Sequence, residues 1–293
     1  MKKLLLLLSL AALLLTTRAV PSAQRGPVAS PPGRIVSLVP ATTEMLYAMG
    51  AGSRVVGVGT YDRYPPEVDK LPRLGGLLDP NIEQLIAIRP DLVIVYDTQT
   101  ELRRQLERAG IPMWGYSTKG LSDVTATIKS LGDRIGMAAQ ANAAATGIDA
   151  RLQAVRTRVA KLPRPKTLLI FGREPGSLRG MNASGGYGFL HDLVELAGGV
   201  DVLGDIKQAA VSMSSEMVLA RAPDVIIELH YGEAWPPAKI ESERRVWSAL
   251  PSVPAVRNGR VTLLTGDEFV VPGPRVPLAA ERLAAVLHPE SSR

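Results

Sequence analysis

The chain has 293 residues, no cysteine, and hydrophobic residues at 46% of its positions. This length allows two domains with a core in each, and the missing cysteines exclude disulfide bonds and a cysteine-linked lipid anchor. The net charge is +6, of which Lys2, Lys3 and Arg18 supply three, and the other basic residues are interspersed with acids. Such a small net positive charge, without a basic cluster, gives no reason to expect a nucleic-acid partner.

The first residues predict a signal peptide. Lys2 and Lys3 precede a stretch, 4–15, that is apolar except for Ser9, and small residues lead to Ala19. Twelve apolar residues fall short of the roughly 20 that span a bilayer, which favours a cleaved signal peptide, residues 1–19, over an uncleaved anchor. We therefore expect an exported protein without a lipid anchor, retained in a periplasm.

The next segment, 20–33, is rich in Pro, Ser, Ala and Gly and predicts a flexible leader. An N-terminal lobe, residues 34–137, follows with alternating strands and helices, which is typical of a parallel sheet covered by helices. The expected strands are 35–39, 55–58, 92–95 and 111–115, and the expected helices are 43–49, 82–88, 100–109 and one from residue 122.

An Ala-rich segment, 138–162, predicts one long helix that ends before Pro163 and Pro165. The alternation then resumes in a C-terminal lobe, residues 163–288. Its expected strands are 167–171, 225–228 and 261–264, and its expected helices are 189–196, 215–220, 241–250 and 277–287. The chain therefore predicts two lobes joined by a rigid helical rod, which limits the lobes to small rocking motions.

One helix-to-strand step occurs twice. Glu83 stands seven residues before Pro90 in NIEQLIAIRPDLVIV, and Glu216 stands seven before Pro223 in SSEMVLARAPDVIIE, an offset of 133 residues. An acid in the first turn of a helix is stabilised by the helix dipole wherever it occurs. The matched placement in both lobes instead favours docking to a two-fold symmetric partner with basic pockets.

Aromatic residues gather in the loops at strand ends, where parallel sheets bind ligands. Eight of the thirteen aromatic residues lie there: Tyr61, Tyr64, Tyr96, Tyr116, Tyr187, Tyr231, Trp235 and Phe269. Any one of them could serve only loop packing, but the set predicts an aromatic-lined cleft between the lobes. Arg173 and Arg179 follow the first strand of the second lobe, and Asp267 and Arg275 follow its last strand.

Enzymatic motifs are missing from the sequence. It holds no GxxxxGK[ST], no GxSxG and no cysteine nucleophile, and its three histidines lack the spacing of a metal site. His230 alone is placed to meet a ligand, although a solvated loop histidine is the commoner case. We therefore expect neither an enzyme nor a bound metal.

The quoted repeats, together with RIVSLVPATTEMLYAMGAGSRVVGV, YDRYPPE and VTLLTGDEF, resemble the helical-backbone periplasmic binding proteins of ABC importers for cobalamin, haem and ferric siderophores. The resemblance covers about residues 34–287. It implies an α/β fold of two Rossmann-like lobes with parallel sheets, joined by one long rigid α-helix, with the ligand cleft between the lobes. It also implies that Glu83 and Glu216 engage arginines of an ABC permease dimer in the inner membrane.

The resemblance implies a corrinoid ligand, with Tyr61 facing the corrin and Asp267 supplying an acid. In the cobalamin members of the family several tryptophans line the cleft, and the stretch AAVSMSS before Glu216 has none. Haem or a ferric siderophore is therefore the alternative ligand, with His230, Tyr231, Arg173 and Arg179 as contacts. The cargo is thus a metal-containing macrocycle or chelate, with no cofactor of the protein's own. We expect ligand contacts from Tyr61, Tyr64, Tyr96, Arg173, Tyr187, His230, Tyr231, Trp235, Asp267 and Phe269; an exported hydrolase is the competing class.

Overall fold

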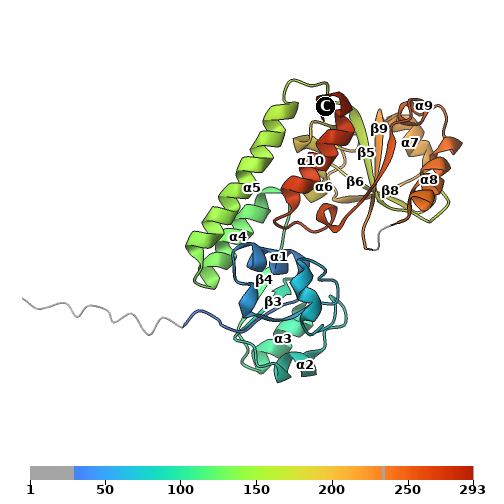
Figure 1. The fold of residues 1–293 in the computed structure, drawn as a ribbon. Coiled ribbons are helices and arrows are strands. Elements are labelled where there is room, and N and C mark those ends of the chain that lie inside the picture. Colours follow the sequence, from blue (N-terminus) through green and yellow to red (C-terminus); the bar gives the residue numbers. More distant parts are fainter. Residues whose placement is uncertain (1–29, 233–234, 293) are drawn as a thin grey trace, which may run out of the picture. The chain divides into compact units, whose positions relative to one another are not determined.

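The computed structural model describes residues 30–232 and 235–292 (Figure 1). The predicted signal peptide, residues 1–19, and most of the predicted leader lie outside the described residues. From Pro31 onward the chain forms one compact unit that contains two β-sheets. Among the described residues, no helix is both long enough and apolar enough to cross a membrane.

The first sheet has four parallel strands in the order β2-β1-β3-β4. Its strands are β1 (Ile35–Ser37), β2 (Val55–Val58), β3 (Leu92–Tyr96) and β4 (Met113–Tyr116). The helices of this lobe are α1 (Pro40–Ala48), α2 (Ile82–Ala87), α3 (Thr100–Arg108) and α4 (Ser122–Arg134), with short 3₁₀ turns at Gly52–Arg54 and Pro66–Lys70. Every strand and helix predicted for this lobe is present, with ends that differ by at most a few residues.

The second sheet is mixed, with strand order β10-β9-β5-β6-β8 and β7 paired to β5. Its strands are β5 (Lys166–Gly172), β6 (Met181–Ser184), β7 (Val200–Asp201), β8 (Ala210–Met213), β9 (Val225–His230) and β10 (Val261–Thr265). The prediction of a purely parallel sheet is wrong here, because β6 runs antiparallel to both β5 and β8. These two strands are short and carry few β-branched residues, so their sequences give little strand signal.

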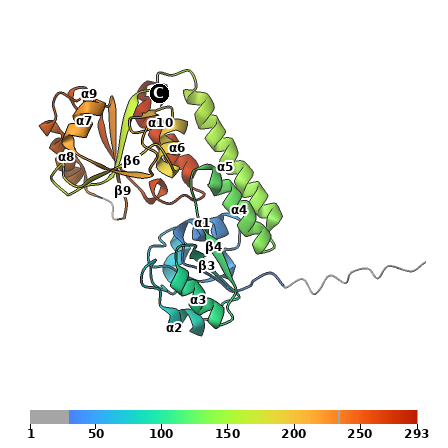
Figure 2. The same cartoon turned by 180° about the vertical axis from the view of Figure 1, so that it is seen from behind.

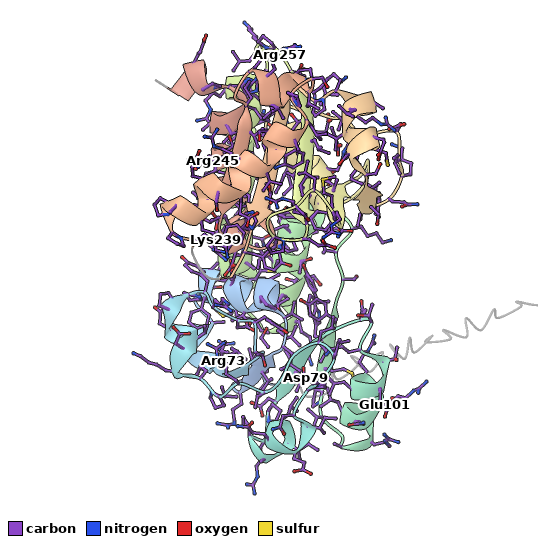
Figure 3. All side chains as sticks on the ribbon, turned by 90° about the vertical axis from the view of Figure 1, so that its right-hand side faces the viewer. Arg73, Asp79, Glu101, Lys239, Arg245 and Arg257 are labelled. Carbon is purple, nitrogen blue, oxygen red and sulfur yellow. The ribbon has the colours of Figure 1, made fainter. Side chains whose placement is uncertain are left out.

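The helices of the second lobe cover this sheet and carry the chain to its end. They are α6 (Phe189–Leu196), α7 (Ser215–Arg221), α8 (Pro237–Arg245), α9 (Pro254–Arg257) and α10 (Val276–Leu287), with 3₁₀ turns at Val246–Ala249, Asp267–Phe269 and Pro289–Ser292. The predicted helix 241–250 is therefore shifted: α8 starts earlier, behind prolines that suit a helix's first turn, and passes into a 3₁₀ turn. Figure 3 shows charged side chains such as Glu101 and Arg257 projecting away from the ribbon.

Helix α5 (Ala138–Val159) connects the two lobes, and its 22 residues are about 33 Å long (Figures 1 and 2). The helix ends three residues before the predicted end, since Leu162 precedes Pro163 and the residue before a proline is disfavoured in a helix. Its buried side chains recur every three or four residues from Ala141 to Val159. This stripe packs against α4, α6 and α10, so one continuous hydrophobic core joins both lobes to the helix.

The repeat predicted from the sequence is also a structural repeat. The Asp91 carboxylate accepts hydrogen bonds from the amides of Gly33 and Arg34, and the Asp224 carboxylate accepts one from the amide of Lys166. In each lobe the aspartate therefore fixes the start of the lobe's first strand, β1 or β5. That strand pairs with the strand that follows the aspartate, β3 or β9. Two non-glycine residues with positive φ also recur, Arg89 at 53° and Ala222 at 46°, each directly before the proline.

Candidate ligand-binding cleft

Loops at the carboxyl ends of strands from both sheets meet around one cavity of about 320 Å³. Parallel strands end at a common edge, so loops that are distant in sequence converge there. The cavity is lined by Pro40, Glu44, Tyr61, Arg63, Tyr64, Tyr231, Gly232, Asp267, Val270, Val271 and Arg275. Four predicted ligand contacts, Tyr61, Tyr64, Tyr231 and Asp267, are thus brought together from two lobes.

Three tyrosines at this cavity are unusually open to solvent. Tyr61 is 68% exposed, Tyr231 is 61% exposed and Tyr64 is 45% exposed. Large aromatic rings normally bury much of their surface, and rings with a polar hydroxyl are favoured contacts in binding sites. Tyr61 and Tyr231 therefore expose most of their surface at this cavity.

An ion pair between the lobes forms one wall of the cavity. The Arg275 guanidinium donates from Nε to Glu44 Oε2 at 2.9 Å and from Nη2 to Oε1 at 2.5 Å. Burial raises the pKa of Glu44, and the hydrogen bonds and charge of Arg275 act against that rise. Arg275 also lies 4.4 Å over the Tyr64 ring and 3.5 Å from Glu268. Arg275 therefore connects helix α1 of the first lobe to the segment before α10.

Sequence reasoning missed Glu44 and gave Arg275 no role. Glu44 is 3% exposed at its side chain and is the one charged residue of helix α1. A buried acid in such a helix requires a partner, which is the one signal in the sequence that points to it. The partner lies 231 residues away, so no local pattern identifies it.

A buried carboxyl lies directly behind the tyrosine loop. Asp62 is 1% exposed and lies between the exposed Tyr61 and Tyr64 in sequence. Burial raises the pKa of Asp62 to about 7, although hydrogen bonds of Thr43 and the Gly59 backbone and the charge of Arg73 act against that rise. The loop is also held through the Asp62 carbonyl, which accepts a hydrogen bond from Arg73.

A second, smaller cavity of about 180 Å³ lies within the C-terminal lobe and shares Tyr231 with the first. Its wall includes Arg173, whose side chain is 2% exposed and pairs with Glu228 at 2.8 Å and Glu243 at 2.9 Å. Burial raises the pKa of Glu228, but the hydrogen bonds of His230 and Trp247 and the charge of Arg173 hold it below its usual value. Two carboxylates therefore pair with Arg173, and its contact with a ligand stays a prediction.

His230 and Trp235 form the aromatic side of this second cavity. Their ring centres are 3.9 Å apart, and His230 Nε2 lies 3.1 Å from Glu228 Oε1. The Lys239 ammonium lies 4.1 Å from the centre of the Trp235 ring (Lys239 is marked in Figure 3). His230 and Trp235 therefore line the cavity of about 180 Å³, and their contact with a ligand stays a prediction.

Three predicted contacts line neither cavity. Phe269 is fully buried, with the Arg282 guanidinium 4.7 Å from its ring centre, and is a core residue in this structure. Tyr96 is half-buried, with its ring at 74° to that of Tyr116 and the centres 5.8 Å apart. Tyr187 is 47% exposed and lies away from both. Position at a strand end does not determine which way a ring points, because the short turn Asp267–Phe269 directs Phe269 inward.

The two predicted docking acids are exposed in the first turns of α2 and α7. Each helix has a side-chain cap: Asn81 accepts from the Gln84 amide at 3.0 Å, and Ser214 accepts from the Met217 amide at 3.3 Å. Glu83 and Glu216 line neither cavity of the cleft. Their positions leave both carboxylates free of the cleft.

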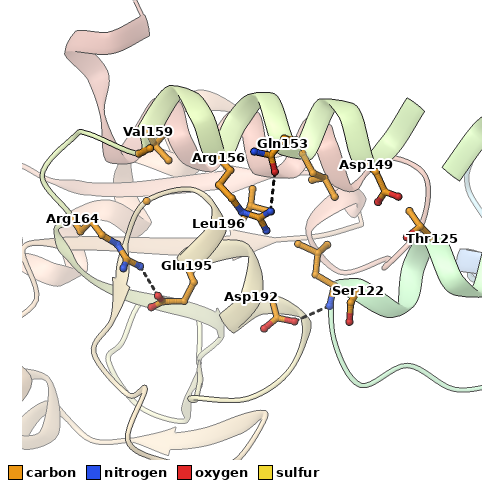
Figure 4. Close-up of a pocket in the computed structure, with 14 residues that line it drawn as sticks. Ser122, Thr125, Asp149, Gln153, Arg156, Val159, Arg164, Asp192, Glu195 and Leu196 are labelled. Carbon is orange, nitrogen blue, oxygen red and sulfur yellow. Dashed lines mark hydrogen bonds and ion pairs between the residues drawn. The ribbon is translucent and has the colours of Figure 1, made fainter. Parts of the chain in front are cut away.

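A larger cavity of about 970 Å³ lies among α4, α5 and α6 (Figure 4). Its charged side chains are largely paired with protein groups: Arg164 pairs with Glu195, and Asp192 accepts from the Leu121 amide at 2.8 Å. No aromatic residue lines it, and it is formed by helices and not by the carboxyl ends of strands. The cavity of about 320 Å³ at the strand ends is therefore the better candidate for a ligand site.

Comparison with known proteins identifies the family. The family model described as "Periplasmic binding protein" matches residues 35–268. A vitamin B12-binding protein of Yersinia pestis is 27% identical over 252 residues, which cover 85% of this chain and 84% of the relative. The crystal structure of a periplasmic vitamin B12 binding protein of Vibrio cholerae matches with a TM-score of 0.74 and 26% identity, over 90% of this chain and 99% of that one.

A third similar protein has a different named ligand. The structure of a periplasmic heme binding protein of Pseudomonas aeruginosa matches with a TM-score of 0.75 and 25% identity, over 88% of this chain and 94% of that one. The competing prediction of an exported hydrolase is therefore not retained, since the family consists of transport proteins. The chain belongs to the periplasmic binding protein family of ABC importers and is a substrate-binding protein, not an enzyme.

Proposed function

We propose that this protein captures a cobalamin-like corrinoid in the periplasm and delivers it to an ABC permease. The observation that carries the proposal is that Tyr61 and Asp267, one from each lobe, line the same cavity. These are the two positions at which the resemblance implied a corrin-facing ring and an acid. The vitamin B12-binding relatives support the same ligand.

The chemistry of the cavity suits a corrinoid. A corrin ring has broad apolar faces and a rim of amide groups, and exposed tyrosine rings can stack on such faces. The Asp267 carboxylate already accepts a hydrogen bond from the Gly232 amide at 2.9 Å and has further acceptor capacity for a ligand amide. A corrinoid is larger than 320 Å³, so its bulk would extend beyond the cavity and cover the open faces of Tyr61 and Tyr231.

Haem is the alternative that a specific observation favours. His230 lies at the neighbouring cavity, and its Nε2 is engaged by Glu228, which directs the remaining ring nitrogen to any metal it would bind. The buried Glu228 would also hold the imidazole in one orientation. A ferric siderophore is less well supported than in the sequence-based expectation, because Arg173 is neutralised by its own lobe.

Visible absorbance of the protein purified from its native periplasm distinguishes these ligands. Corrins, haems and ferric catecholates absorb in different bands, so the bound species identifies itself. We expect a corrin spectrum that disappears after unfolding and dialysis. A Soret band in the native protein would show that its ligand is haem and not a corrinoid.

We also propose that Glu83 and Glu216 dock the loaded protein onto basic pockets of a permease dimer. Their exposure, their matched placement and their absence from the residues that line the cleft support this role. The double variant Glu83→Lys/Glu216→Lys should keep its ligand affinity and lose uptake into membrane vesicles, because like charges at an interface cost several kcal/mol. Glu107→Lys, on the exposed face of α3, is the control. Unimpaired uptake by the double variant would remove the docking role.

A further inference from the structure

The two docking helices share more than a glutamate. Three residues after each glutamate stands an exposed aliphatic residue, Ile86 on α2 and Leu219 on α7. Each of these two residues is 43% exposed. The next residue in each helix is an exposed alanine. The offset of 133 residues that relates the acids therefore also relates an aliphatic residue and a small one.

Helix geometry places these groups on one face. Residues three and four apart are neighbours on a helix surface, so Glu83 lies beside Ile86 and Ala87, and Glu216 lies beside Leu219. The residue directly before the aliphatic residue is buried in both helices: it is Leu85 in α2 and Val218 in α7. The outward faces of α2 and α7 thus carry the same three groups in the same order.

Single exposed aliphatic residues are common on protein surfaces and need no explanation. Chance exposure does not account for two that occupy equivalent positions of a structural repeat with equal exposure.

We infer that each docking site is a composite of a carboxylate, an aliphatic side chain one turn later and a small residue that allows close approach, and that it fits an apolar rim beside each basic pocket of a two-fold symmetric permease. This inference rests on the proposed docking function. The charge steers and orients the encounter, whereas the aliphatic contact is desolvated on docking and lengthens the lifetime of the complex.

The test measures docking directly and does not depend on the ligand. The chain lacks cysteine, so Gln153→Cys on α5 takes a single fluorescent label. Binding of the labelled full chain is measured on right-side-out membrane vesicles of the source organism and on protein-free liposomes made from the same lipids. We expect Ile86→Ser/Leu219→Ser to weaken saturable vesicle binding about tenfold while the melting temperature stays the same.

Matched controls separate this effect from a general loss of surface hydrophobicity. Val200 and Leu278 are 39% and 40% exposed, and Val200→Ser/Leu278→Ser should bind within twofold of the wild type. A second variant, Ala87→Leu/Ala220→Leu, keeps helix-forming residues and should also weaken docking, because it blocks close approach.

The outcomes distinguish the inference from the proposed function. If charge reversal of the two glutamates abolishes binding but the serine and leucine variants bind within twofold of the wild type, the composite site is wrong and the docking function stands. If the wild type shows no saturable binding beyond that to liposomes, both are wrong. A serine effect of equal size on liposomes would assign the aliphatic residues to lipid contact and overturn the inference.

Discussion

Replacing Asp62 with Asn should stabilise the folded protein at pH 8 and leave its stability at pH 4 nearly unchanged. Asp62 is 1% exposed, and burial raises the pKa of its carboxyl from the ordinary value of 3.8 to about 7. The charge of Arg73 does not fully offset this burial, since Arg73 makes its hydrogen bonds to the carbonyls of Gly59 and Asp62 and to Asp69, and the charge of Glu44 adds to the rise.

The sign follows from proton binding in the two states. Below pH 3.8 the carboxyl is protonated in both the folded and the unfolded chain, so its burial carries no ionisation cost. Between pH 3.8 and about 7 the unfolded chain releases the proton while the folded chain retains it, so stability falls as the pH rises. One pKa unit corresponds to about 1.4 kcal/mol, which gives a cost of up to about 4 kcal/mol above pH 7.

Urea unfolding followed by circular dichroism at pH 4, 6 and 8 measures this directly. The difference in unfolding free energy between Asp62→Asn and the wild type should grow with pH and level off above pH 7. Asp133→Asn, at an exposed position of α4, is the control and should show no such growth. A difference that does not vary with pH, or a variant less stable than the wild type at pH 8, would refute the reasoning.

Two further predictions concern the cleft. Tyr61→Ala should weaken cyanocobalamin binding by about 1–3 kcal/mol in calorimetric titration, with an unchanged melting temperature. Phe269→Ala should instead lower the unfolding free energy by about 3–5 kcal/mol, because it empties a core site. Equal losses of stability in the two variants would place Tyr61 in the core. Arg275→Ala should cost about 3–5 kcal/mol in chemical denaturation because it leaves Glu44 buried without its partner, and adding Glu44→Gln should recover part of the loss. A cost below about 1 kcal/mol would show that the pair does not hold the lobes together.

Much of the fold could be predicted because its signals are local. The N-terminal strands are apolar runs between helices, and the repeated Pro-Asp step marks the start of one strand in each lobe. The prolines after α5 fix its end to within three residues. Strands β6 and β8 escaped prediction because their pairing depends on residues brought together by the fold and not on their own composition.

The site was predictable only in part. The exposed tyrosines were found because they follow strands, and strand ends of a parallel sheet converge. The ion pairs of Arg173 could not be predicted, because its partners Glu228 and Glu243 are 55 and 70 residues further along the chain and nothing near Arg173 points to them. The burial of Phe269 could not be predicted either, because the direction of its ring depends on the short turn Asp267–Phe269.

Calorimetric titration of the purified chain with cyanocobalamin, with hemin as the comparison, distinguishes a corrinoid-binding protein from a haem-binding one. We expect one saturable event at one cyanocobalamin per chain, weakened by Tyr61→Ala and by Asp267→Asn and unaffected by Glu83→Lys. Saturable binding of hemin with no binding of cyanocobalamin would contradict it.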